Sequence, residues 1–256
     1  MRYYPGMPEE EVEWDRVSAD YLQYRAGPPP SFYARLKEQG VGLPGQRLLD
    51  LGTGTGVLAR HFARAGARVT GVDASRGQIE QAVRAAADEG LSIEYRVAPA
   101  ESMPFDAGSF EAVTANQCWH FFDSEKALGE ARRVLVRGGT LAVSDFFWVA
   151  ARDPIAAATE DLILKYSPKW NGYRWSGELP ARPDMTHDDV IVYEEPVAFT
   201  RDTWRGRLRT CRAIGPVLSP SQVAAFDEEL RKLLESSTPE RFEVLHRIVV
   251  HLYRMA

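Results

Sequence analysis

The 256-residue chain has only two cysteines, Cys118 and Cys211, and no run of apolar residues long enough to cross a bilayer. Two cysteines provide no metal-ligand spacing and at most one disulfide, so we expect free thiols and no metal site. The first residues lack the apolar core of a signal peptide. These absences predict a cytoplasmic protein that does not bind membranes.

Positive charge is also scarce, because 31 Lys and Arg residues face 36 Asp and Glu residues, giving a formal net charge of -5. A broad basic surface for nucleic acid is therefore not expected. The chain also lacks the Pro-Pro-aromatic tetrapeptide with which enzymes that methylate nucleic-acid amino groups stack a flipped base. A small-molecule partner is the class that remains, and the sequence does not decide the oligomeric state.

Apolar residues make up 45% of the chain, which is enough to bury one α/β core and a smaller accessory element. We predict a single domain over residues 1–256, with a cofactor-binding core at 36–147 and an N-terminal helical arm at 1–35. Residues 148–189 form an aromatic-rich segment that either covers a substrate or covers only its own small core. Residues 190–256 supply the last strands and helices, with strands at 190–193 and 242–250, the latter at the antiparallel edge.

A glycine-rich turn is the most informative local feature. Residues 48–56 read LLDLGTGTG, a buried strand that stops at three alternating glycines, and a helical pattern follows. Glycines allow a sharp turn and let a ligand reach bare backbone amides. A second strand, residues 68–73, ends in Asp73, where a carboxylate accepts hydrogen bonds from both hydroxyls of a ribose. The pattern predicts a nucleotide-like cofactor.

The same turn fits a dinucleotide fingerprint in a second register, Gly54-Thr55-Gly56-Val57-Leu58-Ala59, so an NAD(P)-dependent oxidoreductase is the first alternative. Asp50 argues against it, because this carboxylate would repel a pyrophosphate but attract a ligand ammonium group. Residues 98–105, APAESMPF, follow a third strand at 93–97 and bring backbone and Glu101 to an adenine edge.

Several further motifs follow in order. A fourth strand at 110–115 leads into NQCWHFFD at 116–123, and RRVLVRGG occupies 132–139. Together the motifs resemble the class I S-adenosylmethionine-dependent methyltransferases, in the small-molecule branch that includes trans-aconitate methyltransferase-like enzymes and ubiquinone-menaquinone-type domains. The resemblance runs from about residue 20 to 147. Two positions depart from it: Pro99 replaces a common Asp, and Phe121-Phe122 replaces Trp-Phe, with the tryptophan at Trp119.

The resemblance implies an α/β fold: a Rossmann-like, doubly wound, seven-stranded sheet, mostly parallel with an antiparallel last strand. It implies S-adenosylmethionine as methyl donor and S-adenosylhomocysteine as product. It assigns the methionine end to the turn, the ribose to the end of the second strand, and the adenine to the segment after the third strand. The implied cofactor residues are Asp50, Gly52, Thr53, Gly54, Gly56, Asp73, Ala74, Ala100, Glu101, Asn116, Gln117, Tyr24 and Arg25.

The remaining aromatic and basic residues are the candidates for the acceptor site. We predict that Tyr21, Trp148 and Trp204 line it. Arg205 and Arg209, at helical spacing beside an apolar stripe, either clamp an anionic or carboxylate-bearing metabolite or form a solvated helix face.

His120 either accepts a proton from the acceptor or packs to hold its loop. The acceptor atom stays open among oxygen, nitrogen and carbon. A non-catalytic adenosylmethionine-binding protein is the second alternative.

Overall fold

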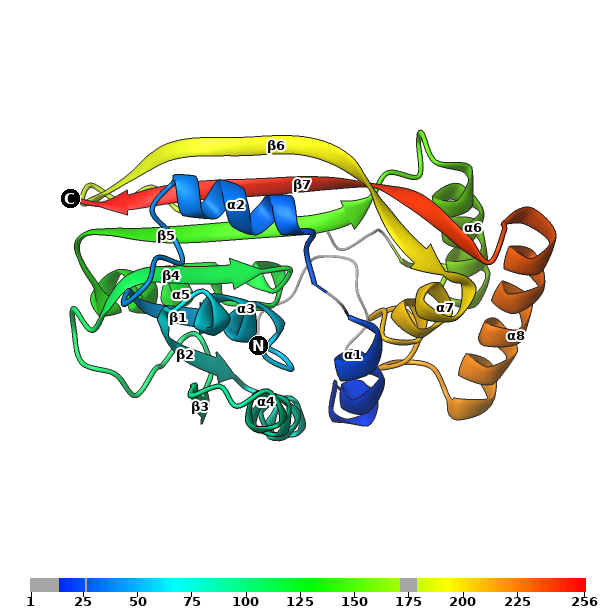
Figure 1. Cartoon of the computed structure of the whole chain (residues 1–256), viewed down its shortest axis with the longest axis horizontal. Helices are drawn as coiled ribbons and strands as arrows, with labels where there is room; N and C mark the ends of the chain where they lie inside the picture. Colours follow the sequence, from blue (N-terminus) through cyan, green and yellow to red (C-terminus); the bar gives the residue numbers. More distant parts are fainter. Residues whose placement is uncertain (1–13, 26, 171–178) are drawn as a thin grey trace.

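A single seven-stranded sheet organises the molecule, in the order β3-β2-β1-β4-β5-β7-β6 (Figure 1). The computed structural model describes residues 14–25, 27–170 and 179–256. Strands β1 to β5 are parallel, and β7 is antiparallel to both of its neighbours. This arrangement confirms the predicted fold class. The strands are β1 (Arg47–Leu51), β2 (Arg68–Asp73), β3 (Glu94–Val97), β4 (Phe110–Asn116), β5 (Leu135–Trp148), β6 (Met185–Thr200) and β7 (Arg241–Met255).

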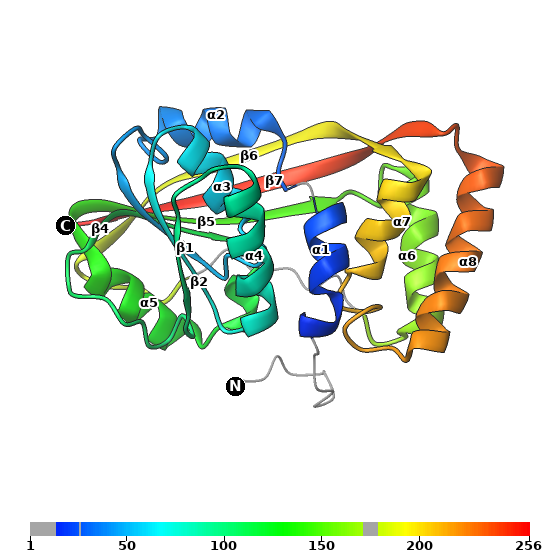
Figure 2. The ribbon, with the colours of Figure 1, turned by 60° about the horizontal axis from the view of Figure 1, so that its bottom comes forward.

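Helices cover both faces of the sheet and extend beyond one end of it (Figures 1 and 2). They are α1 (Ser18–Tyr24), α2 (Pro30–Glu38), α3 (Val57–Arg64), α4 (Arg76–Asp88), α5 (Ser124–Val134), α6 (Pro154–Tyr166), α7 (Arg201–Arg209) and α8 (Pro220–Ser237). A 3-10 turn, Trp14–Val17, precedes α1, and another spans Trp119–Phe121. Within the described part of the chain, no helix is both long and apolar enough to span a membrane.

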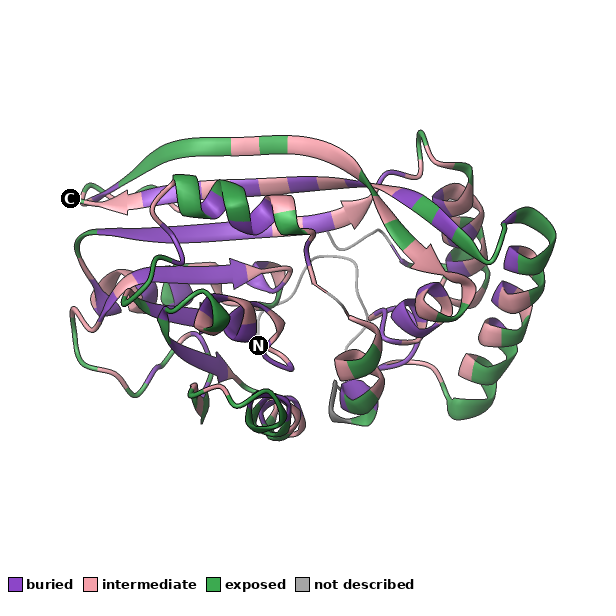
Figure 3. Ribbon diagram, viewed as in Figure 1, coloured by how far each residue is buried: buried purple, intermediate pink, exposed green. Residues whose placement is uncertain are grey.

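The central strands are buried on both faces, as expected of parallel strands between helices. Leu48 of β1 packs in one cluster with Phe62 of α3, whereas its neighbour Leu49 packs in a second cluster with Leu128 of α5. This period of two is the strand geometry, since successive side chains point to opposite faces. Figure 3 shows the result as buried strands between helices whose outer faces are exposed.

The position of β7 differs from the prediction. The sequence places it at the edge of the sheet, but it lies between β5 and β6, and β6 is the edge strand. The two strands pair along almost their whole length, from Met185 with Met255 to Thr200 with Arg241. The exposed residues at the start of β6, 186–189, are polar or charged, and Pro196 lies further along, and both features discourage pairing with another chain at this edge.

Three helices, α6, α7 and α8, form what we call the helical cap, at the end of the sheet where β5, β6 and β7 extend past the other strands (Figures 1 and 2). Trp204 of α7 and Phe226 of α8 lie in its core. The predicted segment 148–189 supplies α6 but also the start of β6, and its Tyr173 and Trp175 lie outside the described residues. Helix α1 contacts α4 on one side and α7 on the other, between the sheet and the cap (Figure 2).

Candidate functional site

The carboxyl ends of three adjacent parallel strands bring polar side chains to one edge of the sheet. Asp50 lies near the end of β1, Asp73 ends β2 and Asn116 ends β4. The order of strands reverses between β1 and β4, and open α/β sheets bind ligands outside the strand ends at such a switch point. The two carboxylates and the glycine turn that the sequence singles out therefore meet where this fold binds ligands.

Three adjoining cavities open along this edge. The turn cavity includes Arg25, Asp50, Gly52, Thr53, Gly54 and Arg207. The central cavity includes Gly54, Asp73, Ala74, Gln78, Ala100 and Glu101. The cap cavity includes His120, Asp145, Trp148, Trp170, Arg207 and Arg212. Tyr21 and Gln117 line all three, so the cavities share walls. The central cavity spans about 860 Å³ counted to its open mouth, within the usual range for small-molecule sites of about 300–1,000 Å³.

The glycines of the turn are required by geometry. Gly52, Gly54 and Gly56 have φ angles of 56°, 56° and 76°, a region that side chains disfavour. A Cβ on Gly52 would lie 2.7 Å from Cβ of Cys118, and one on Gly56 would lie 2.3 Å from the Tyr95 hydroxyl oxygen. Gly56 shapes the start of α3 and is not among the residues that line the three cavities.

Asp50 is a buried carboxylate with only 2% of its surface exposed. It accepts hydrogen bonds from the hydroxyls of Thr53 and Thr114, each at 2.7 Å. Burial, opposed by those two bonds, raises the pKa of Asp50 to about 6. Within residues 14–25, 27–170 and 179–256 no basic side chain pairs with it. The turn cavity therefore presents a negative charge that a cationic ligand group can neutralise.

Asp73 holds the glycine turn to the end of β2. One carboxylate oxygen accepts from the Gly54 amide and the other from the Ser75 amide, both at 2.9 Å. Nearby in the central cavity, the buried side-chain oxygen of Gln78 has no hydrogen-bond partner among the described residues. Glu101 accepts from the Asp123 amide at 2.8 Å. An unpartnered buried oxygen beside a fixed carboxylate is suited to a ligand with several hydroxyl or amino donors.

The end of β4 is held in an uncommon conformation. Gln117 has a φ of 55°, the one positive value among the described non-glycine residues. The backbone N–H of Gln117 donates to the backbone carbonyl of Ser144 at 2.8 Å. The side-chain oxygen of Asn116 accepts from the Ser144 hydroxyl at 2.9 Å. Both side chains reach the turn and central cavities. Backbone conformations of this kind cost energy and are concentrated at functional sites.

In the cap cavity, aromatic rings and charged groups of both signs surround the open space. His120 is there, as predicted, and its Nδ1 is enclosed without a hydrogen-bond partner in the described chain. Burial, reinforced by Arg212, lowers the pKa of His120 to about 3. The imidazole is therefore neutral at pH 7 and a weak base. Trp148 donates its ring N–H to Glu160 at 2.8 Å, and Arg25 donates to the Thr210 hydroxyl at 2.9 Å.

The structure places two of the predicted aromatic residues away from the three cavities. Trp204 has no exposed surface and donates to the Thr159 hydroxyl at 3.2 Å, inside the core of the helical cap. It lines none of the three cavities, so it is part of the packed core of the cap and not of a cavity wall. Tyr24, predicted to bind the cofactor, instead packs on α7, with the Arg209 guanidinium 5.0 Å from its ring centre. Tyr24 fills the space that a Cβ on Gly206 would need.

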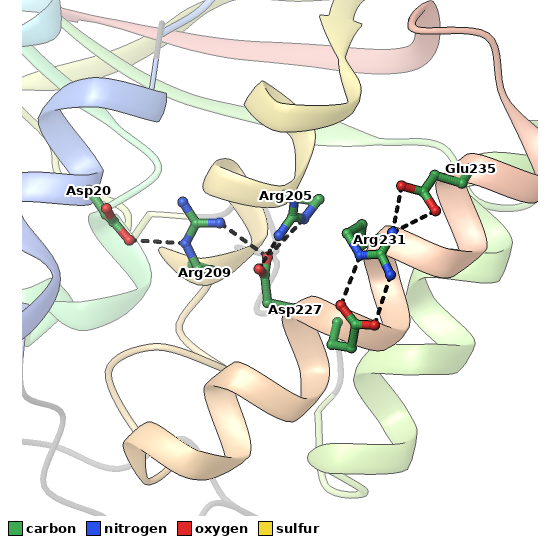
Figure 4. A network of polar contacts seen from close by, with 7 residues as sticks. Asp20, Arg205, Arg209, Asp227, Arg231 and Glu235 are labelled. Carbon is green, nitrogen blue, oxygen red and sulfur yellow. Dashed lines mark hydrogen bonds and ion pairs between the residues drawn. The ribbon is translucent and has the colours of Figure 1, made fainter.

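The prediction that Arg205 and Arg209 line the acceptor site is also corrected. Both are paired with Asp227 of α8, and Arg209 also pairs with Asp20 of α1 at 3.2 Å (Figure 4). Neither lines a cavity. Their charges are neutralised by carboxylates from distant parts of the chain, so these arginines join α1, α7 and α8 and do not clamp an anion.

A third arginine of the same helix does reach the cavities, and the sequence reasoning missed it. Arg207 is 3% exposed and lines both the turn and the cap cavity. It lies three residues after Trp204 and one before Leu208, beside the two buried apolar residues of α7. The sequence does contain a signal for this burial, which is an arginine inside an apolar stripe, because a side chain on that face is buried when the helix docks.

Comparison with known proteins agrees with this geometry. Residues 49–143 match the model of the family described as "Methyltransferase domain". The demethylmenaquinone methyltransferase of Thermus thermophilus is 44% identical over 104 residues, which cover 40% of this chain and 47% of that protein. The ubiquinone biosynthesis O-methyltransferase of Xanthomonas campestris is 32% identical over 175 residues, covering 66% of this chain and 72% of that one.

Among solved structures, the [4+2]-cyclase SpnF superposes with a TM-score of 0.55 at 20% identity, over 94% of each chain. At that identity the likeness shows the fold alone. The chain spans about half to three fifths of the length of the first three curated relatives that it matches. The Xanthomonas match is longer and covers more than two thirds of its relative. The chain therefore belongs to the class I S-adenosylmethionine-dependent methyltransferases.

Proposed function

We propose that the protein transfers the methyl group of S-adenosylmethionine to a small molecule that carries an anionic group. The observation that carries the proposal is the continuity of the three cavities, with the carboxylate of Asp50 at the turn and the guanidinium of Arg207 toward the cap. A ligand with an ammonium group fits the first, and an anionic ligand fits the second. Shared walls keep the two ligands close enough to react.

The walls of the turn and central cavities suit the parts of S-adenosylmethionine. Asp50 receives the ammonium group of the methionine end, and Arg25 lies in the same cavity for its carboxylate. Asp73 accepts from the ribose hydroxyls, in addition to the two backbone amides that already fix its orientation. Gln78 and Glu101 border the space left for the adenine. Gly52 and Gly54 admit the ligand against bare backbone, and Asn116 and Gln117 close the methionine side.

The chemistry supplied by the bound cofactor is an electrophilic methyl group on a sulfonium. The protein's task is then to align donor and acceptor and to exclude water, because in-line displacement depends above all on geometry. Gln117 and Tyr21 stand between the cofactor cavities and the cap cavity and limit where an acceptor can lie. His120, with its lowered pKa, orients or packs against the acceptor more readily than it takes a proton. An acceptor that is already anionic needs little help from a base.

Calorimetry on cofactor-stripped protein tests the proposal. S-adenosylmethionine, S-adenosylhomocysteine and NADPH are titrated in parallel. We expect micromolar binding of the first two and none of NADPH. NADPH binding alone would reinstate the oxidoreductase alternative and overturn the proposal.

One structural neighbour is named a [4+2]-cyclase, so likeness of fold does not by itself establish methyl transfer. Binding is therefore followed by a transfer assay with methyl-labelled S-adenosylmethionine and a panel of small acids, phenols and amines. Transfer to none of them, together with tight cofactor binding, would favour the non-catalytic alternative.

A further inference from the structure

We propose that Arg207 binds the carboxylate of a planar aromatic acid in the cap cavity, which makes it the residue that selects the methyl acceptor. The inference rests on the proposed function and names the class of acceptor. It is carried by the burial of Arg207, by the absence of a carboxylate partner among the described residues, and by the aromatic residues of the cavity that Arg207 lines.

Arg207 is a buried cation that has no counter-charge among residues 14–25, 27–170 and 179–256. Only 3% of its surface is exposed, and its Nε atom is enclosed with no hydrogen-bond partner in the part of the chain that the structure describes. None of the ion pairs found in the described residues involves it, in contrast to Arg205 and Arg209 on the same helix. A buried charge that lacks a partner is costly, so a ligand anion that approaches this guanidinium recovers interaction energy that water and protein do not supply.

Aromatic rings and one repulsive positive charge, that of Arg25, lie near Arg207. Its guanidinium lies 5.1 Å from the ring centre of Phe146 and 5.9 Å from that of Phe199. Burial, followed by repulsion from Arg25, lowers the pKa of Arg207 to about 9. It therefore keeps its charge at pH 7. Two carboxylates, Asp145 and Glu160, also line the cap cavity, and Glu160 accepts a hydrogen bond from the Trp148 ring N–H.

The remaining walls favour a flat ring. Phe121, Phe147, Trp148 and Trp170 line the cap cavity, and the last two are stacked with ring centres 6.3 Å apart and planes inclined by 29°. Aromatic side chains stack well on planar ligands, typically adding about 0.5–1.5 kcal/mol per ring pair beyond the area buried. Together with an arginine that matches a carboxylate in two-point geometry, these rings define the site for an aromatic acid.

One competing role follows from the position of Arg207. It also lines the turn cavity, so it could instead bind the carboxylate of the cofactor's methionine end. Arg25 occupies the same cavity and is half-buried. Its guanidinium donates to the hydroxyl and the carbonyl of Thr210 and lies 5.1 Å from the ring centre of Tyr21, and no ion pair of Arg25 is found within the described residues. The test therefore measures cofactor and acid binding separately.

The experiment titrates benzoate, benzamide and cyclohexanecarboxylate into the protein by calorimetry, with and without saturating S-adenosylhomocysteine. The variant is Arg207→Met, which keeps a long side chain but removes the charge. The matched control is Arg205→Met, which removes a guanidinium two residues away on the same helix, outside the cavities. We expect benzoate to bind the wild type at least tenfold more tightly than either analogue. Arg207→Met should lose that preference, and Arg205→Met should keep it.

Each outcome bears on the proposal. Because the charge of Arg207 is buried without a partner, Arg207→Met should unfold at a temperature equal to or above that of the wild type, so lost binding would not reflect lost folding. If Arg207→Met weakens S-adenosylhomocysteine as much as benzoate, Arg207 holds the cofactor and the inference is overturned. Equal binding of benzoate and benzamide, or of benzoate and cyclohexanecarboxylate, overturns the anionic or the aromatic part respectively. Failure of S-adenosylhomocysteine to bind the wild type overturns the proposed function instead, and the cofactor-free titration still reports on Arg207.

Discussion

Replacing Asp50 with Asn should stabilise the ligand-free protein and abolish most of its affinity for the cofactor. The pKa of the Asp50 carboxyl rises from 3.8 to about 6 in the fold. Since this pKa is raised, the contribution of the carboxyl to stability is fully present below pH 3.8 and is lost as the pH rises through 6. The ligand-free protein therefore holds a destabilising charge at pH 7, which the cofactor's ammonium group would neutralise in the proposed binding mode.

The size of the effect follows from the two pKa values. At about 1.4 kcal/mol for each pH unit between them, the ionised carboxylate costs about 3 kcal/mol above pH 7. At pH 5 the cost is about 1.6 kcal/mol by the same relation. Asn keeps one acceptor for the hydroxyls of Thr53 and Thr114 and loses the other, which costs about 1 kcal/mol at every pH. The advantage of Asp50→Asn should thus grow by about 1.4 kcal/mol from pH 5 to pH 8.

Differential scanning fluorimetry on stripped protein between pH 5 and pH 8 measures this growth. For a chain of this length, about 1.4 kcal/mol corresponds to roughly 3–6 °C in the midpoint temperature. In parallel, added S-adenosylhomocysteine should raise the midpoint of the wild type and not that of Asp50→Asn. Asp161→Asn, which removes an exposed carboxylate of α6 outside the three cavities, serves as the control and should keep the response to ligand. A midpoint difference that stays constant with pH would refute the reasoning.

Three other predictions concern the same site. Asp73→Ala should weaken S-adenosylhomocysteine binding by about 2 kcal/mol, or roughly 30-fold by calorimetry, because a carboxylate that accepts from ribose is lost; unchanged affinity would rule out that role. Wild-type affinity for the same ligand should fall by up to about tenfold per pH unit below pH 6, as Asp50 becomes protonated, and Asp50→Asn should show no such dependence. The imidazole proton signal of His120, assigned by its loss in His120→Gln, should not titrate between pH 5 and pH 8 in NMR spectra; a midpoint near 6.5 would contradict the burial described for this ring.

The parts of the site that depend on local sequence were predictable. Asp50, the glycine turn and Asp73 lie within one strand-turn-helix-strand unit of 26 residues, from 48 to 73, so their spacing alone brings them together. The apolar stripe that begins in α7 likewise identifies the buried face, since Trp204 and Leu208 of the helix and Cys211 just after it are buried.

The roles of the arginines on α7 were not predictable, because they depend on distant partners. Arg205 and Arg209 are neutralised by Asp227, 22 and 18 positions away, and by Asp20, 189 positions from Arg209. No periodicity within one helix contains that information. The position of β7 in the sheet was not predictable for the same reason. Strand order depends on which strands pair, whereas the sequence pattern indicates only that both strands are present.

The three long strands that connect the sheet to the helical cap also restrict how ligands enter. Enzymes with two lobes often open by rotation about a few hinge residues. Here β5, β6 and β7 cross from one part to the other as a continuous hydrogen-bonded ladder, and opening by a hinge would break it. Helix α1 contacts both parts, and its Tyr21 lines all three cavities. Displacement of α1 would open the cavities and leave the ladder intact. The rate of product release should accordingly depend on how tightly α1 docks, through the Asp20 to Arg209 pair, rather than on any motion of the cap.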